Sequence, residues 1–257
     1  MRERREGQKK GQKRERLLSI AAALVLWQIL SMAVGQKFIL VSPITAAARL
    51  GKIALKGDFW LTVGFSFLRI EAGFFLGLIL GSVLAVAAAG VPLLETMLWP
   101  YMTAVKSVPV ASFIILCLIW LDRSGLSVFI SFLMVLPIFY FNVLSGMKSA
   151  DRKLLEMAEV FRISRFKRFC YLYLPQVRPF LFSACSAALG ISWKAGVAAE
   201  VIGIPDGSIG ERLYEAKVYL DTAELFAWTA VVVFTSVLFE KAFMGLLKRA
   251  FERLERL

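Results

Sequence analysis

Lys194 and Glu200 lie six residues apart in an otherwise apolar run. If either charged side chain faced hydrocarbon at mid-bilayer, membrane insertion would cost about 2.5–3.5 kcal/mol for that residue. Both side chains should therefore face protein or water. In a regular helix this spacing gives about 9 Å of rise and roughly 120° of rotation, too far for an i, i+4 pair. A bend at Gly196 would bring the two charges together as a buried salt bridge. Alternatively, Lys194 bonds backbone carbonyls elsewhere.

Other residues that could support chemistry are few. The sequence has no histidine, which excludes histidine-based triads, axial haem histidines and histidine-ligated metal sites. Cys117, Cys170 and Cys185 are isolated and form no CxxC pair. Neither a Gly-x-Ser-x-Gly nor a Walker glycine loop occurs, so the chain has no visible means of hydrolysing ATP or a peptide. We therefore expect no catalytic residue, no metal site and no cofactor bound by this chain.

The elements that position these residues are long and apolar. The chain has 257 residues, of which 58% are hydrophobic, and a mean hydropathy of +0.68, against about 45–50% apolar residues in a soluble domain. About 20 apolar residues cross a bilayer as a helix, and the runs lack the period-two alternation of a barrel. The sequence predicts an all-α polytopic membrane protein with six transmembrane helices: 17–34, 60–91, 97–121, 126–146, 174–203 and 222–247.

The distribution of positive charge predicts the orientation. Segments 2–16, 148–168 and 248–257 contain 19 of the 31 lysine and arginine residues. With six spans these segments share one side, and the positive-inside rule makes that side cytoplasmic. We expect a basic cytoplasmic N-terminal segment (1–16), a transmembrane domain (17–257) and cytoplasmic termini. The net charge of +12 is then explained by topology and anionic lipid rather than by nucleic acid. A cleaved signal peptide is the weaker alternative, because the first apolar run is too long.

The loop 148–175 is basic and amphipathic. Leu154, Leu155, Ala158 and Phe161 recur at helical spacing after Asp151, which predicts one short helix. A second helix is predicted with Ser164 as its N-cap and a stripe of Phe166, Phe169, Cys170 and Tyr173, and Pro175 allows a new helix to start. These faces either rest on the membrane surface or dock into a groove of another protein.

Several motifs resemble those of ABC importer permeases of the nitrate, sulfonate and taurine branch. Glu156-Met157-Ala158 with Leu172-Tyr173-Leu174-Pro175 is similar to their EAA loop, and Ser192-Trp193-Lys194 with Val197-Ala198-Ala199-Glu200 is similar to a downstream motif. The likeness covers nearly the whole chain after residue 40. Met157 replaces the first Ala of the motif, and Arg162 stands where the family usually has Gly. Either Arg162 adopts the strained left-handed conformation, or the turn moves to Ile163 and Ser164.

The resemblance implies a permease subunit in a prokaryotic cytoplasmic membrane, coupled to a separate cytoplasmic ATPase that would bind ATP and Mg²⁺. It further implies an extracytoplasmic substrate-binding protein and a second permease subunit, giving a homodimer or a heterodimer. The transported solute would be small and anionic or polar. Residues implied to meet the ATPase are Glu156, Met157, Ala158, Phe161, Arg162, Phe166 and Phe169. Residues implied to line the pathway are Ser192, Trp193, Lys194 and Glu200.

Two other classes compete with this interpretation. A membrane-embedded enzyme would need ionisable groups that converge in the bilayer, and the candidates are Arg69, Glu71, Lys194 and Glu200. A membrane scaffold would need none. The phenylalanines of the loop could also pack on their own bundle. Small residues at Gly73, Gly77, Gly81, Ala184, Ala187 and Ala188 could support helix contacts within or between subunits.

Overall fold

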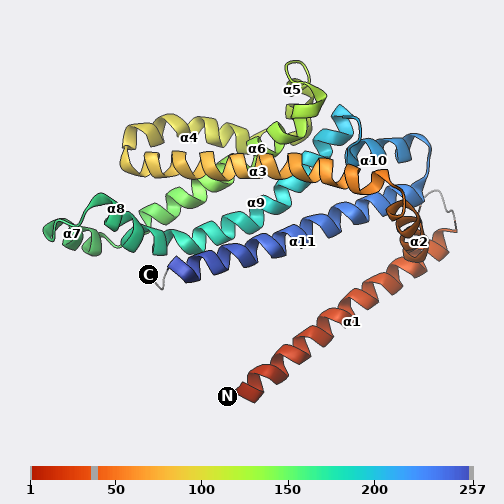
Figure 1. Cartoon of the computed structure of the whole chain (residues 1–257), viewed down its shortest axis with the longest axis horizontal. Helices are drawn as coiled ribbons and strands as arrows, with labels where there is room; N and C mark the ends of the chain where they lie inside the picture. The colour runs from red at the N-terminus through yellow and green to blue at the C-terminus, as the bar shows by residue number, and fades with distance from the viewer. Residues whose placement is uncertain (1, 36–39, 255–257) are drawn as a thin grey trace. The chain divides into compact units, whose positions relative to one another are not determined.

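The computed structural model describes residues 2–35 and 40–254, and these form helices without any strand. The all-α prediction is therefore confirmed (Figure 1). The elements are α1 (Arg2–Val34), α2 (Pro43–Ala54), α3 (Asp58–Gly90), α4 (Pro92–Ser107), α5 (Val110–Cys117), α6 (Arg123–Lys148), α7 (Arg152–Val160), α8 (Arg165–Arg168), the π-helical turn η1 (Phe169–Tyr173), α9 (Leu174–Gly203), α10 (Ile209–Val218) and α11 (Thr222–Leu254).

Within the described residues, four helical stretches are long and apolar enough to cross a membrane: 58–90, 123–148, 166–203 and 222–253. The bent pair α4 and α5 adds a fifth span if the two helices cross together. The apolar part of α1, Leu18–Val34, is shorter than these. The membrane-protein class is thus confirmed, and the count of six spans stays a prediction.

The prediction that residues 97–121 form a single helix was wrong. It is divided into α4 and α5, which meet at an angle of 101°. Pro109 has no backbone N–H, and its ring disfavours helical geometry in the residue before it. Val108 accordingly has an extended backbone, with φ −75° and ψ 134°.

Two compact units make up the chain: Met1–Phe59 with Arg212–Ala230 (unit 1), and Trp60–Glu211 with Val231–Leu257 (unit 2). In unit 2, α6 is the central helix. Of the residues in its most apolar stretch, 56% are buried, compared with 33% in the corresponding stretch of α3. A core of α6 and α9 residues that includes Leu126, Ile130 and Ala199 packs against α5. Phe74 of α3 and Phe139 of α6 belong to a second core with α9.

Three glycines let α3 approach α6 closely. A Cβ at Gly73 would meet the carbonyl oxygen of Val128, and one at Gly77 would lie 2.7 Å from Val135 Cγ1. At Gly81 the nearest atom would be the Leu136 carbonyl oxygen, at 2.7 Å. These glycines therefore pack within one subunit. Ala184 and Ala188 are likewise buried inside the bundle, whereas Ala187 is exposed.

Candidate functional site

The segment between α6 and α9 begins with the short helix that the sequence predicts. Asp151 is its N-cap, and the carboxylate accepts a hydrogen bond of 2.9 Å from the Lys153 backbone N–H. This bond satisfies one of the donors that the first turn of any helix leaves unpaired. In Figure 1, α7 and α8 lie beyond the ends of α6 and α9, at one end of unit 2.

The apolar residues of α7 divide between two faces. Ala158 is fully buried and Leu155 half-buried, so they hold the helix against its own subunit. Large apolar side chains on the other side are exposed: Leu154, Met157, Val160 and Phe161. The four residues predicted at helical spacing, Leu154, Leu155, Ala158 and Phe161, are therefore divided between the contact with the bundle and the exposed surface. At about 100° per residue they span an arc of about 120°, and the edge of the contact divides that arc.

Arg162 ends α7 in the left-handed conformation, with a φ of 51°. Its N–H donates to the Glu159 carbonyl at 2.9 Å, and the Ile163 N–H donates to the Ala158 carbonyl at 2.9 Å. These two bonds form a Schellman motif, in which glycine usually occupies the left-handed position. Of the two alternatives left open by the sequence, Arg162 itself takes the strained position and the turn does not move. Its side chain is exposed.

The second helix of the loop does not end before α9. Ser164 precedes α8, and the Lys167 N–H lies 3.5 Å from its Oγ. The chain then passes through η1 into α9, so residues 166–203 form one helical stretch, and the prediction of a separate second helix was wrong. A π turn shifts the backbone hydrogen bonding by one residue, and this turn ends two residues before Pro175, which has no N–H to donate. Phe166 is 77% exposed and Phe169 37%.

The four predicted pathway residues occupy two different environments. Lys194 is exposed and, among the residues that the structure describes, makes no ion pair. Ser192, Trp193 and Glu200 are buried inside the subunit. The Ser192 hydroxyl donates to the Leu189 carbonyl at 2.9 Å, and its own carbonyl accepts from Ser131 at 3.1 Å. α9 continues through Gly196, so Lys194 and Glu200 are not brought together.

Buried hydrogen bonds connect α9 to α3. Trp193 Nε1 donates to Glu71 Oε1 at 2.7 Å. The Glu200 carboxylate accepts from the Ser66 hydroxyl at 2.7 Å and from the Gly210 N–H at 3.2 Å. Ser66 Oγ in turn accepts from the Ile209 N–H at 2.8 Å, so Glu200 and Ser66 together fix the first turn of α10. Ser66 gave no signal in the sequence, since its partners lie more than 130 residues away.

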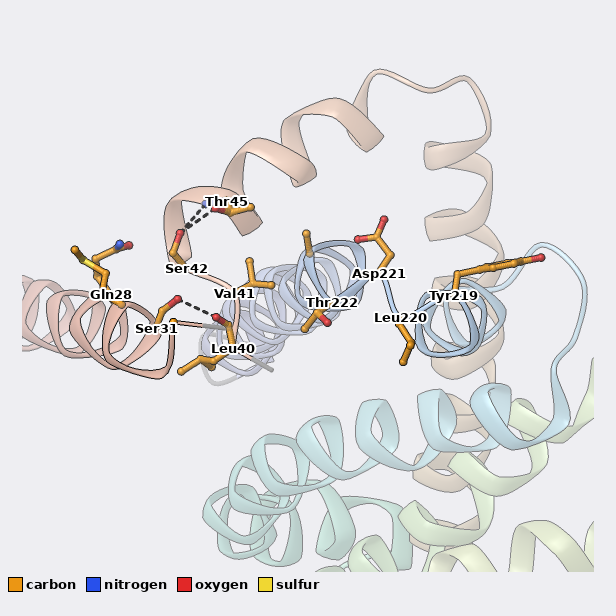
Figure 2. Close-up of a pocket in the computed structure, with 13 residues that line it drawn as sticks. Gln28, Ser31, Leu40, Val41, Ser42, Thr45, Tyr219, Leu220, Asp221 and Thr222 are labelled. Atoms are coloured by element: carbon orange, nitrogen blue, oxygen red, sulfur yellow. Dashed lines mark hydrogen bonds between the residues drawn. The ribbon is translucent and has the colours of Figure 1, made fainter. Parts of the chain in front are cut away.

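Unit 1 contains a cavity of about 730 Å³ between the end of α1, the start of α2 and the α10–α11 turn (Figure 2). Its wall is built from local caps: Ser31 donates to the Leu40 carbonyl at 2.9 Å, and the Thr45 N–H donates to Ser42 Oγ at 3.2 Å. Asp221 caps α11 by accepting from the Glu224 N–H at 3.0 Å.

An arginine on α2 adds charge pairing near this cavity. Arg49 Nη2 lies 2.5 Å from Asp221 Oδ2 and 2.6 Å from Glu224 Oε2. The cluster connects α2 to the start of α11 within unit 1. These contacts pair charges and cap helices, so we assign them a role in stabilising the fold of unit 1.

Long apolar helices, joined by an exposed basic segment with an amphipathic helix, define a multi-pass membrane protein. Residues 73–255 match the family model described as the binding-protein-dependent transport system inner membrane component. The chain belongs to this family.

Three curated relatives match most of the chain. The putative aliphatic sulfonates transport permease protein SsuC of Bacillus subtilis (strain 168) is 26% identical over 224 residues, which cover 86% of this chain and 80% of that protein. The bicarbonate transport system permease protein CmpB of Synechocystis sp. is 25% identical, covering 78% and 75%. The taurine transport system permease protein TauC of Escherichia coli (strain K12) is 24% identical over 246 residues, covering 92% and 89%.

The protein is therefore a permease subunit of an ABC importer, in the branch that contains sulfonate and taurine permeases, and it is a multi-pass inner-membrane protein. The resemblance stated from the sequence is confirmed. Its relatives are named as transport permeases, so its role is transport rather than an enzymatic reaction. Permeases of this family work with an ATPase and a binding protein.

Proposed function

We propose that this chain pairs with a second copy of itself to form a pathway for a small anionic or polar organic solute. In this proposal α7 and the turn after it are the coupling element that docks into a separate cytoplasmic ATPase, which binds ATP and Mg²⁺. An extracytoplasmic binding protein delivers the solute. Both termini, including the basic segment 1–16, lie in the cytoplasm, and residues 17–257 form the permease domain.

One observation carries the coupling proposal: the exposed apolar side chains of α7 and α8. Met157, Phe161 and Phe166 face away from the bundle, and Phe161 is 71% exposed. Burying a large apolar side chain contributes about 1.5–3 kcal/mol, so this surface favours a protein partner that covers it. Ala158 is fully buried in its own subunit, and we assign it to the close packing of α7 rather than to direct contact.

Substitution of the exposed face tests the coupling proposal. Phe161→Arg and Glu156→Lys are expected to weaken binding of the ATPase or to uncouple hydrolysis, while membrane insertion stays intact. Val218→Arg, at an exposed apolar position of α10, is the matched control and should leave the ATPase bound. Normal transport with normal ATPase stimulation in both loop variants would contradict the proposal. A loop that only rests on lipid would give that result.

Orientation and pairing are tested separately. A reporter fused after Leu257 should be cytoplasmic, and one inserted between Asp206 and Gly207 should be extracytoplasmic, because 19 of the 31 basic residues define the cytoplasmic side. Reporters on the same side would contradict the topology. Cysteine cross-linking along α9 should trap a permease dimer, and a complete scan without any dimer would contradict the homodimer.

Lys194 supports the pathway proposal because it is exposed without an ion pair in the described part of its own subunit. We propose that Lys194 lines the pathway, while the buried Ser192, Trp193 and Glu200 position α9 behind it. Lys194→Met removes the charge and keeps the length of the side chain, so it should reduce transport without preventing assembly. Unchanged transport, together with a Lys194→Cys thiol that no water-soluble reagent labels, would contradict this assignment.

A further inference from the structure

A cavity of about 270 Å³ lies where α4, α6 and α9 meet in unit 2. α4 contributes Lys106 to its wall, α6 contributes Phe141 and Asn142, and α9 contributes Ile191. The remaining lining residues are apolar. The cavity therefore combines one ammonium group and one amide with an apolar wall, which is the usual composition of a site for a small ligand.

This cavity lies well inside the spans. Ile191 is about 25 Å along α9 from the first residue of that helix and about 18 Å from the last. Lys106 is about 21 Å from the start of α4, close to the break between α4 and α5. Ile191, from the middle of α9, lines the same cavity as Lys106. Lys106 therefore lies at the depth of the apolar part of the spans rather than at a lipid headgroup.

No carboxylate among the described residues neutralises Lys106. Its Nζ lies 5.8 Å from the centroid of the Phe141 ring. Such a contact stabilises a cation by about 0.5–2 kcal/mol, which is less than the about 2.5–3.5 kcal/mol that a lysine costs at mid-bilayer. Lys106 is exposed in the described subunit, so water or an anion can complete its surroundings.

Polar groups beside Lys106 point to an anion. Asn142 Nδ2 uses one N–H on the Ile138 carbonyl at 2.8 Å, and the second amide N–H remains to donate. Lys194 lies three residues beyond Ile191, on the same face of α9, and is exposed. The buried carboxylate of Glu200, by contrast, already accepts two hydrogen bonds.

We propose that Lys106 and Asn142 form an anion-binding subsite that opens onto the pathway beside Lys194. The subsite takes the negative group of a small organic anion, such as a sulfonate or a carboxylate, and Ile191 and Phe141 contact its apolar part. This inference rests on the proposed pathway and adds two specificity-determining residues, Lys106 and Asn142.

Charged thiol reagents test the subsite without knowledge of the natural substrate. An Ile191→Cys variant is made in a background that lacks Cys117, Cys170 and Cys185. It is assembled with its ATPase in membranes and treated with an anionic sulfonatoethyl or a cationic trimethylammonioethyl methanethiosulfonate. Reaction rates are compared with Lys106 present and after Lys106→Met. Ile138→Cys is the second reporter, in case the first variant does not assemble.

With Lys106 present, the anionic reagent should react faster than the cationic one. Lys106→Met should lower the ratio of the two rates about threefold to tenfold, as expected for a unit charge several ångströms away in a wet site. Lys248→Met, at the far end of α11, should leave the ratio unchanged. The same ratio with and without Lys106, or no reaction in either the nucleotide-free or the vanadate-trapped complex, would overturn the inference. Labelling of a Lys194→Cys variant by the same reagents is scored separately, so its absence would count against the proposed pathway and not against the subsite.

Discussion

Glu200→Ala is expected to release the first turn of α10 from α3. The carboxylate is fully buried and accepts from the Ser66 hydroxyl at 2.7 Å and from the Gly210 N–H at 3.2 Å. Its removal leaves both donors buried without an acceptor. An unsatisfied buried donor costs about 1–3 kcal/mol, so the free energy of unfolding should fall by roughly 2–6 kcal/mol. Glu200→Gln keeps an acceptor oxygen and should lose only about 1–2 kcal/mol.

Thermal unfolding in detergent gives the order of stability, and amide exchange at residues 209–211 locates the change. Glu95→Ala is the matched control, because it removes a carboxylate from an ion pair with Lys148, whose side chain is 54% exposed. Exposed pairs contribute about 0–1 kcal/mol. If Glu200→Ala is as stable as Glu95→Ala and residues 209–211 keep their protection, the hydrogen bonds of Glu200 do not hold α10.

Three further predictions concern other parts of the chain. Gly73→Val should destabilise the contact of α3 with α6 by about 1–3 kcal/mol, measured by thermal unfolding, since its Cβ would meet the Val128 carbonyl oxygen; an unchanged midpoint contradicts this. Arg162→Gly should stabilise the end of α7 by up to about 1 kcal/mol, seen as slower exchange of the Ile163 amide; faster exchange contradicts it. Arg49→Met should cost about 1 kcal/mol, and less at high salt; an effect independent of salt would contradict an ionic role.

Hydropathy was sufficient to predict most of the fold. Apolar runs of membrane length identified α3, α6 and α11 to within a few residues at their starts, because each run must satisfy its backbone groups internally. The break at Val108 and Pro109 was missed, since a hydropathy window averages over a single proline. The continuity of α8, η1 and α9 was also missed, because Pro175 indicates a helix start and a π turn has no comparable signal.

The surroundings of the candidate site residues could be predicted in part, and their roles stay predictions. Spacing alone placed the loop outside the apolar runs and identified Phe161 and Phe166, both of which are exposed. Which face of α7 contacts the bundle depends on tertiary packing, so Ala158 could not be assigned. Lys106 also had no signal in the sequence, because its position beside Asn142 and Ile191 follows only from the arrangement of three helices.

The most direct test of the central claim is the ATP hydrolysis that co-purifies with the tagged chain from native membranes. The account predicts an eluate that hydrolyses ATP, although this chain has no nucleotide-binding motif of its own. It also predicts that Phe161→Arg combined with Phe166→Arg abolishes this hydrolysis, while the chain remains in the membrane and Val218→Arg has no effect. Full ATP hydrolysis with the double variant, or none with the parent chain, would contradict the coupling role of α7 and α8.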